Sequence, residues 1–297
     1  MSDELPPVPE MVNRRGSLRS GTIMLTSVGL VVAVVLVVAL VTILISNGPQ
    51  KARFGNTSPV VLNELETVPL SVFNAVGVNS PMIQVAELVE AKGHPPLAVT
   101  VGNKTLPEAL YVGADYCPYC GATRWGIIVA LSRFGTFNGL YDMFSSATDV
   151  YPSTPTFSFD GTGPSDVVTY TSKYLVFTPY ETLTRNSTPL MTLPPAVDNL
   201  VVRYDTYQGQ TGGIPFMDMN NHWLIQGSMF DPGTLAGHTR DSIAAGLTDP
   251  SNSVTQAIIA SANYVSAGIC AMTHSQPASV CRSSGVLAAA TAMQMTL

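Results

Sequence analysis

The chain has 297 residues, a formal net charge of −6, and 11% charged against 46% hydrophobic residues. Globular domains average about 25% charged residues, so part of this chain is unusually apolar. The acidic balance and the lack of basic runs exclude a nucleic-acid-binding surface of the usual kind.

The first informative segment is the apolar stretch at 23–45, IMLTSVGLVVAVVLVVALVTILI, which has 23 residues and no charge. As a helix it is about 34 Å long, enough to cross a bilayer. It is longer than the apolar part of a signal peptide, about 7–15 residues, and no small-residue cleavage site follows it. We therefore predict an uncleaved transmembrane helix at 23–45, preceded by a disordered polar tail at 1–22.

Two observations orient this helix. Arg14, Arg15 and Arg19 precede it and Lys51 and Arg53 follow it, so the positive-inside rule favours a cytoplasmic N-terminus. All four cysteines lie after the helix, and an even number suits an oxidising compartment. The sequence thus predicts a single-pass plasma-membrane protein whose large domain is extracytoplasmic.

Beyond the apolar stretch, a turn-rich linker is expected at 46–64 and one folded domain at 65–297. Alternation and β-forming residues predict strands, and 3.6-residue periods predict helices. The expected strands are 97–101, 109–114, 156–159 and 174–178, then a strand or helix end at 199–204 and a hairpin around Asn220-Asn221. The expected helices are 118–134, one that begins with a capping box at Ser253, and 286–295. This order predicts an α/β fold with a mixed sheet flanked by helices.

The sequence Cys-Pro-Tyr-Cys at 117–120 follows the strand 109–114 and begins a predicted helix. Such a pair is a redox centre, half of a metal site or a structural disulfide. The nucleophile in disulfide exchange is the thiolate, and a helix N-terminus, with its partial positive charge and unpaired N–H groups, lowers the pKa of a thiol placed there. We expect Cys117 to be exposed at that end, Pro118 to suit the first turn, and Cys120 to be the more buried thiol.

A second stretch, GGIPFMDMNNHWLIQG at 212–227, places Pro215 at the start of the predicted hairpin. Together with GADYCPYCGATRW at 113–125, it resembles the thioredoxin-like superfamily. In that superfamily a Cys-x-x-Cys pair lies between the first core strand and its helix, opposite a cis-proline that begins a hairpin. The whole chain is most similar to an uncharacterised family of membrane-anchored or secreted thioredoxin-like proteins of actinobacteria and archaea. The resemblance covers about residues 95–135 and 205–230.

This resemblance implies a thioredoxin-like mixed sheet with C-terminal helices and a large insertion, since 98 positions separate Cys117 from Pro215. It implies two catalytic thiols, Cys117 and Cys120, and a cis bond before Pro215. It also implies that an extended substrate peptide pairs with the exposed backbone of Ile214. The implied substrate-binding residues are Pro118, Tyr119, Ile214 and Pro215. Such a site needs no cofactor other than its own redox-active disulfide.

The other two cysteines, Cys270 and Cys281, flank a segment in which Pro277 interrupts a helix. Their simplest interpretation is a structural disulfide, worth about 3 kcal/mol in the chain-entropy model. A second redox pair and two free buried thiols are the alternatives. Zinc at Cys270, His274 and Cys281 has irregular spacing, and copper near His222 is disfavoured by distance along the strand, so no metal site is predicted.

Two functions are compatible with these residues. The first is a membrane-anchored extracytoplasmic thiol–disulfide oxidoreductase that acts on the thiols or disulfides of partner proteins through Cys117 and Cys120. The second is a non-catalytic accessory subunit that docks on a membrane protein complex, because a fold does not fix a function. The long segment of about 70 residues between Phe137 and Thr206 favours the second interpretation.

Overall fold

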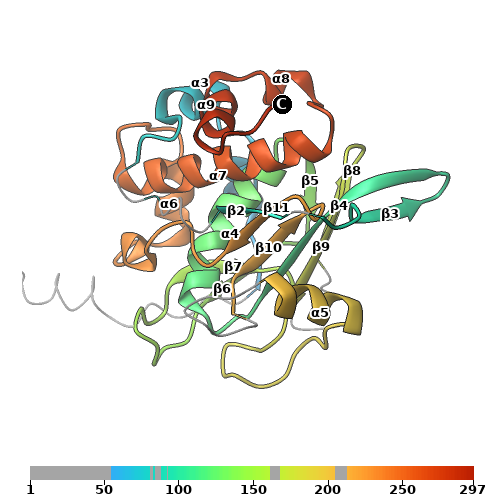
Figure 1. Ribbon diagram of the computed structural model, residues 1–297. Coiled ribbons are helices and arrows are strands. Elements are labelled where there is room, and N and C mark those ends of the chain that lie inside the picture. Colours follow the sequence, from blue (N-terminus) through green and yellow to red (C-terminus); the bar gives the residue numbers. More distant parts are fainter. Residues whose placement is uncertain (1–54, 81–82, 84–87, 92, 161–167, 205–212) are drawn as a thin grey trace, which may run out of the picture. The chain divides into compact units, whose positions relative to one another are not determined.

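The computed structural model describes the chain at residues 55–80, 83, 88–91, 93–160, 168–204 and 213–297. All of these residues belong to the unit Arg53–Leu297 (Figure 1). The predicted tail at 1–22, the predicted membrane helix at 23–45 and the first part of the predicted linker lie outside the described residues.

A six-stranded mixed sheet forms the centre of the domain. Across the sheet its strands are β2 (Leu88–Glu90), β11 (Trp223–Gln226), β10 (Phe216–Met219), β4 (Lys104–Gly113) and β9 (Val176–Glu181), and β3 (Ala98–Val101) pairs with the first half of β4. β4 is parallel to β9 and antiparallel to β10, and β10 and β11 form a hairpin. The predicted mixed α/β sheet is therefore confirmed. The hairpin arm of β3 and β4 projects from the sheet (Figure 1).

The central strand β4 is buried on both faces. Ala109 and Tyr111 point into the larger hydrophobic core, whereas Leu110 and Val112 point into a smaller core on the other face. A strand that alternates between two cores reads as a continuous apolar run, which is why the sequence around 109–114 predicted it. The smaller core is covered by α5 (Pro195–Tyr204), so the open choice at 199–204 resolves to a helix.

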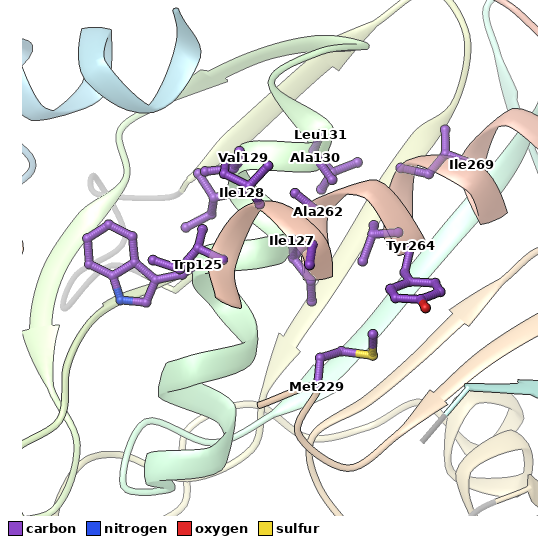
Figure 2. Packing of buried hydrophobic residues seen from close by; sticks show 14 of the residues in the cluster. Trp125, Ile127, Ile128, Val129, Ala130, Leu131, Met229, Ala262, Tyr264 and Ile269 are labelled. Atoms are coloured by element: carbon purple, nitrogen blue, oxygen red, sulfur yellow. The ribbon is translucent and has the colours of Figure 1, made fainter. Parts of the chain in front are cut away.

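The larger core lies between the sheet and two long helices, α4 (Pro118–Leu131) and α7 (Ser253–Met272). Figure 2 shows Ile127, Ala130 and Leu131 of α4 where α7, with Ala262 and Ile269, crosses that helix. The two helices approach closely where Gly126 faces Ser261, because a Cβ atom on Gly126 would lie 2.9 Å from the Ser261 Cβ. A glycine at this point lets the backbones meet, and any larger residue would separate the helices.

Helix boundaries differ from the predicted ones in three places. The N-cap of α7 is Asn252, whose side chain accepts from the backbone N–H groups of Val254 and Thr255, so the predicted capping box at Ser253 is wrong by one residue. α4 ends at Leu131 and not at 134. The C-terminal helix was predicted at 286–295, but the structure has α9 at Ser284–Ala292, preceded by the short α8 (Ala278–Cys281). A further helix, α6 (Arg240–Gly246), lies before α7.

The folded domain begins earlier than 65. β1 (Gly55–Asn56) pairs with β6, and α2 (Pro59–Glu66) buries Val61 and Leu65 in the larger core. α3 (Leu70–Val76) adds a second helix to the same core. The predicted linker at 46–64 is therefore too long, because the apolar residues of α2 belong to the fold.

The segment between α4 and β9 builds two further small sheets. One has the order β1–β6–β7, with β6 (Tyr141–Phe144) and β7 (Pro155–Ser158), and the other pairs β5 (Gly135–Asn138) with β8 (Thr169–Ser172). β7 lies against α4: the Thr156 hydroxyl donates to the Gly121 carbonyl at 2.8 Å, and the Trp125 indole N–H donates to the Pro155 carbonyl at 2.9 Å. The insertion is thus packed on the helix that begins at the cysteine pair.

Among the described residues, α7 alone is long and apolar enough to cross a membrane. However, 89% of its most apolar 18-residue window is buried inside the protein. That burial, together with its packing on α4, makes α7 the central core helix of the domain.

The hairpin of β10 and β11 contains a buried carboxylate. Asn220 and Asn221, in the three-residue connection between the strands, both have positive φ, 65° and 53°, and the Met219 carbonyl accepts from the His222 N–H at 3.2 Å. The Asp218 Oδ1 accepts from the Asn221 N–H at 2.6 Å, whereas its buried Oδ2 has no hydrogen-bond partner among the described residues. Burial raises the pKa of Asp218 to about 7, and the charge of Glu108 adds to the rise.

We expect the stability of the domain to fall as the pH rises from about 4 to about 7, because the folded state binds more protons than the unfolded state over that range. The raised pKa of Asp218, about 7 against 3.8, accounts for up to about 4 kcal/mol of this loss. Asp218→Asn keeps an oxygen for the Asn221 N–H and removes the charge. Its free energy of unfolding in urea should exceed that of the wild type by about 2–4 kcal/mol at about pH 8 and depend less on pH. The exposed Asp198→Asn serves as control, and an unchanged pH slope in Asp218→Asn would contradict the assignment.

Candidate functional site: a cysteine pair at a helix N-terminus

Cys117 is the N-cap residue of α4. Its backbone is extended, with φ −74° and ψ 120°, and Pro118 occupies the first helical position. The Cys117 sulfur accepts from the Cys120 backbone N–H at 3.2 Å, and the Cys117 carbonyl accepts from the Gly121 N–H at 3.0 Å. The sulfur therefore takes the place that a serine or aspartate oxygen takes at most helix N-termini, where partial positive charge favours an anion.

Both thiols of the motif are free and buried. Cys120 is completely buried, as predicted, but Cys117 is only 5% exposed, so the expectation of an exposed Cys117 is wrong. The insertion packs on both sides of Cys117 in the sequence: the Ser146 N–H, in the segment between β6 and β7, donates to the Tyr116 carbonyl at 2.8 Å, and Thr154 lies against Gly121. These contacts arise from residues well outside the motif.

The two thiols differ in acidity. A hydrogen bond from the Cys120 thiol is the largest effect that lowers the pKa of Cys117, and the Cys120 N–H and the Arg124 charge lower it further against the opposing effect of burial. Burial raises the pKa of Cys120 well above its ordinary value, and the hydrogen bond to Cys117 raises it too. Cys117 is therefore the thiol that ionises first, which is the condition for a nucleophilic cysteine.

A buried ion pair lies behind the cysteines. Arg124, one turn after Cys120, donates from Nε to Glu181 Oε1 at 2.8 Å and from Nη2 to Glu181 Oε2 at 2.5 Å, and neither side chain is exposed. Its Nη2 also donates to the Ala114 carbonyl at 2.9 Å and lies 3.9 Å from Asp115 Oδ1. Burial raises the pKa of Glu181 to about 7, although the Arg124 charge opposes that rise. Tyr111 belongs to the same buried cluster, with 6.0 Å between its ring centroid and the Arg124 Cζ atom.

Sequence reasoning missed this pair. Arg124 lies off the apolar stripe of the predicted helix, which is typical of a solvent-facing residue. Glu181 is the last residue of β9 and lies 57 positions away, so no spacing rule connects the two. The one available signal was chemical: an arginine one helical turn after a Cys-x-x-Cys pair places a positive charge near the thiols.

Pro215 and the cysteine motif lie at the same end of the sheet, where β10 begins and β4 ends. Phe216 pairs with Val112 in the antiparallel register, so Pro215 stands beside the end of β4, from which the chain enters the motif. The Ile214–Pro215 peptide bond is cis, as the resemblance implied. The Pro215 carbonyl accepts from the Gly227 N–H at 2.9 Å, and the Ile214 side chain packs into the smaller core. Register thus brings both residues, predicted as substrate-binding, to the end of the sheet that carries the thiols.

Pro118 and Tyr119 separate the two cysteines. Pro118 is buried, whereas Tyr119 is 40% exposed and turns its ring toward Tyr151. Of these two predicted substrate-binding residues, Tyr119 is the one with the larger exposed side chain.

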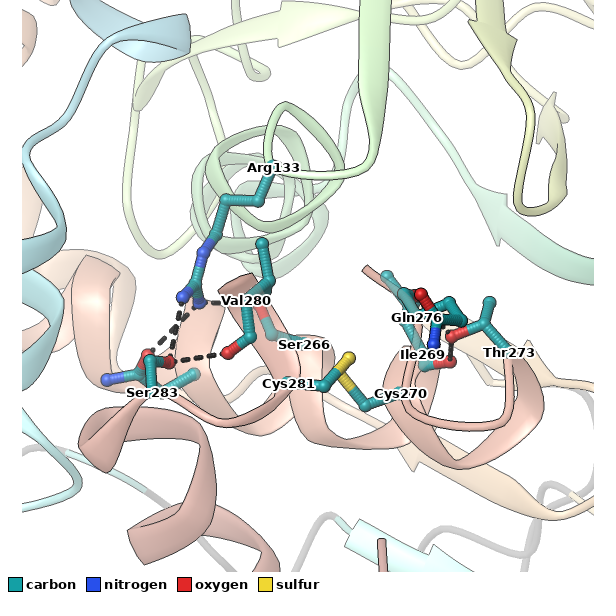
Figure 3. The surroundings of a disulfide bond; sticks show 10 residues. Arg133, Ser266, Ile269, Cys270, Thr273, Gln276, Val280, Cys281 and Ser283 are labelled. Atoms are coloured by element: carbon teal, nitrogen blue, oxygen red, sulfur yellow. Dashed lines mark hydrogen bonds between the residues drawn. A yellow bond between two sulfur atoms is a disulfide. The ribbon is translucent and has the colours of Figure 1, made fainter. Parts of the chain in front are cut away.

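The second cysteine pair is a disulfide. Cys270, near the end of α7, is bonded to Cys281 of α8, with 5.6 Å between the Cα atoms, and both residues are buried (Figure 3). Arg133 reaches the same region from the end of α4 and donates to the hydroxyls of Ser266 and Ser283 at 3.0 and 3.2 Å. The predicted structural disulfide is therefore confirmed, and it joins helices on the side of the core where α4 ends.

The metal alternatives find little support in the donor groups. In the part of the chain that the structure describes, no three histidine, cysteine, aspartate or glutamate side chains gather as they would around an ion. Met217 and Met219, which precede His222, are buried in the larger core, and His222 itself is exposed beside Glu90.

The described domain is thus a mixed α/β fold with a free thiol pair at a helix N-terminus, above a buried ion pair. Residues 99–271, more than half of the chain, match the family described as a domain of unknown function, DUF929. The chain therefore belongs to the DUF929 family, and the matched span contains Cys117, Cys120 and Pro215. Comparisons with curated proteins and with solved structures gave no match.

Proposed function

We propose that this protein is a membrane-anchored, extracytoplasmic thiol–disulfide oxidoreductase that acts through Cys117 and Cys120. The observation that carries the proposal is the position of two free thiols at the N-terminus of α4, where the Cys117 sulfur accepts from the Cys120 N–H at 3.2 Å. Cys117, the N-cap of α4, has a lowered pKa, whereas the buried Cys120 has a raised one. A pair used only as a structural crosslink does not need this asymmetry.

The topology supports a thioredoxin-like fold for the domain. β4 leads into α4 through the cysteine motif, β9 runs parallel to β4, and the hairpin β10–β11 continues the sheet on its other side before α7. The proline with a cis bond stands at the start of β10. These are the relations that the resemblance implied, and they favour an insertion between α4 and β9, because β9 and α5 belong to the central sheet and its covering layer.

In the proposed reaction the Cys117 thiolate attacks one sulfur of a partner's disulfide. A Cys117–substrate disulfide forms, and the displaced substrate thiolate leaves and takes up a proton from solvent. Cys120 then loses its proton and attacks the Cys117 sulfur, which releases the second substrate thiolate and leaves a Cys117–Cys120 disulfide. Two electrons pass from the protein to the substrate, and the reverse sequence oxidises a partner's thiols.

Glu181 and Arg124 are the charged groups that act on Cys120 from within the core. The Glu181 carboxylate is buried, its charge raises the pKa of Cys120, and its own pKa is about 7. Arg124 holds the carboxylate through two hydrogen bonds and lowers the pKa of both thiols. On the substrate side, the backbone next to Pro215 is placed to pair with an extended peptide beside the reactive sulfur.

The first test is the reduction potential of the pair. The full-length chain, purified in detergent, is equilibrated in glutathione buffers, and the Cys117 and Cys120 thiols are quantified by labelling and mass spectrometry. We expect a potential between about −120 and −270 mV, the range of exchange catalysts, with Cys270 and Cys281 unlabelled throughout. A potential below about −300 mV would reject the proposal, since that value is typical of structural disulfides.

One observation favours the alternative of a non-catalytic accessory subunit on a membrane protein complex. Cys117 is only 5% exposed, and the insertion packs beside the motif through the hydrogen bond from the Ser146 N–H to the Tyr116 carbonyl. The double variant Cys117→Ser/Cys120→Ser distinguishes the two functions in cells. An accessory subunit would keep its partners and its phenotype, whereas an oxidoreductase would lose its activity and show no covalent complexes.

A further inference from the structure

Three segments distant in the sequence form one exposed face beside Cys117. Tyr119 comes from the cysteine motif, Val150 and Tyr151 from the segment between β6 and β7, and Asp231 from the start of the 3-10 helix η3 (Pro232–Leu235). Tyr119 is 40% exposed and Val150 67% exposed. Exposure of single apolar side chains is ordinary, so the contacts and charges of these residues have to carry the argument. We call these four residues, with Asp149, the tyrosine–carboxylate face.

The face is held together by specific contacts. The rings of Tyr119 and Tyr151 meet edge to face, with 5.8 Å between their centroids. The Tyr151 hydroxyl donates to Asp231 Oδ2 at 2.7 Å, and Asp231 Oδ1 accepts from the Gly233 N–H at 2.6 Å. Tyr151 is therefore fixed between the motif and η3, and the two tyrosine rings are presented together.

The charge of the face is negative. Asp231 is exposed, and the carboxylate of Asp149 is half-buried and receives the Val150 N–H at 2.6 Å. The Asp149 charge reaches the motif, since it contributes to the raised pKa of Tyr116, after burial and the two cysteines. Arg185 is the cation that contacts this segment, and its Nε donates to the carbonyls of Phe144 and Ser145 at 3.0 and 2.8 Å.

Tyrosine rings next to carboxylates form a recognisable binding chemistry. The face of a tyrosine ring attracts a guanidinium or ammonium group, and it does so with greater effect when a carboxylate nearby supplies opposite charge. An acidic aromatic surface also speeds the encounter with a basic partner and slows that with an acidic one.

We propose that the tyrosine–carboxylate face binds a basic segment of the partner protein, with an arginine or lysine side chain close to the cysteine that Cys117 attacks. This inference rests on the proposed function and specifies its substrate class. The occupant is an extended, positively charged peptide, because the face is acidic and lies beside the start of β10, where a strand would add.

Three matched peptides test the inference on the reduced full-length protein in detergent. Each peptide carries one cysteine as a mixed disulfide with glutathione, and they differ only in an arginine, glutamine or glutamate two positions before that cysteine. We expect second-order exchange rates in the order arginine, glutamine, glutamate, with about a tenfold span at low salt that shrinks at about 0.5 M salt.

Two variants assign the preference to the face. Asp231→Asn keeps an oxygen for the Gly233 N–H, places an amide N–H that can donate to the Tyr151 hydroxyl oxygen, and removes the charge. Asp149→Asn keeps an oxygen for the Val150 N–H and removes the charge there. Each should reduce the span between the arginine and glutamate peptides by about threefold at low salt. Asp198→Asn, on α5 across the sheet, is the matched charge control and should leave the span unchanged.

The outcomes separate the inference from the proposed function. Equal rates for the three peptides in the wild type, or a span that Asp198→Asn reduces as much as Asp231→Asn does, would overturn the inference and leave the oxidoreductase standing. No exchange with any of the peptides, under conditions in which denatured protein reacts with all three, would overturn both.

Discussion

Replacing Glu181 by alanine is expected to lower the free energy of unfolding by about 3–5 kcal/mol, because the buried Arg124 guanidinium loses the carboxylate that accepts two of its hydrogen bonds and keeps only the Asp115 carboxylate, at 3.9 Å. Both side chains are completely buried, and two hydrogen bonds at 2.8 and 2.5 Å join them. A charge left alone in such surroundings keeps its full desolvation cost. Urea unfolding of the full chain at about pH 8, where Glu181 is largely ionised in the wild type, measures the loss.

A matched substitution shows that the loss belongs to the pair. Asp198→Ala removes an exposed carboxylate from the first turn of α5 and should change the stability by less than about 0.5 kcal/mol. A similarly small effect of Glu181→Ala would contradict the buried ion pair, because water would then have to reach the guanidinium.

The double variant Arg124→Met/Glu181→Leu separates stability from reactivity. Apolar residues of similar volume often replace a buried ion pair at no net cost, so this variant should recover most of the stability that Glu181→Ala loses. It also removes the Arg124 charge, which lowers the pKa of Cys117. If the variant is stable and yet has a higher Cys117 pKa, then the Arg124–Glu181 pair lowers the pKa of Cys117 in addition to stabilising the fold.

The parts of the fold that local pattern determines were predictable from the sequence. The apolar run at 109–114, the helix start at Pro118 and the turn at Asn220 and Asn221 each have a signal within a few residues, and the structure has an element at each of these places. α2 was missed because the turn-rich stretch before it was extended through 64, although Ser58 and Pro59 supply an N-cap and a proline in the first turn of a helix.

The site was predictable only in its local half. The N-cap position of Cys117 follows from the strand, the proline and the helical period, all of which are adjacent in the chain. The burial of Cys117 and the Arg124–Glu181 pair depend on segments that return from the insertion and from β9. No pattern within the motif encodes those contacts. From the motif alone one expects Cys117 to be exposed, and the charges around it cannot be predicted.

Alkylation of the reduced protein should modify one thiol of the motif at neutral pH. We expect Cys117 to react with iodoacetamide with a midpoint below the value of about 8.5 for free cysteine, and Cys120 to react only after denaturation. Peptide mapping by mass spectrometry across the pH range measures both. Equal modification of the two residues in the native protein would contradict the assigned asymmetry.

Substitutions at Cys120 test the cause of the low Cys117 pKa. The hydrogen bond from the Cys120 thiol is the largest effect that lowers it, so Cys120→Ala should raise the Cys117 midpoint, whereas Cys120→Ser, which keeps a donor, should raise it less. Arg124→Met/Glu181→Leu should raise it as well. If all three variants kept the wild-type midpoint, the helix N-terminus alone would set the acidity of Cys117.

The dependence of the alkylation rate on pH also separates the acidity of Cys117 from the accessibility of its sulfur to the reagent. The midpoint reports the pKa of Cys117, whereas the plateau rate at high pH reports how freely the reagent reaches a sulfur on a side chain that is 5% exposed. A low midpoint together with a plateau far below that of the urea-unfolded chain means that the insertion restricts access to an activated thiol. A substrate peptide must then displace or fit against the segment between β6 and β7, so changes in that segment should alter the plateau and leave the midpoint in place.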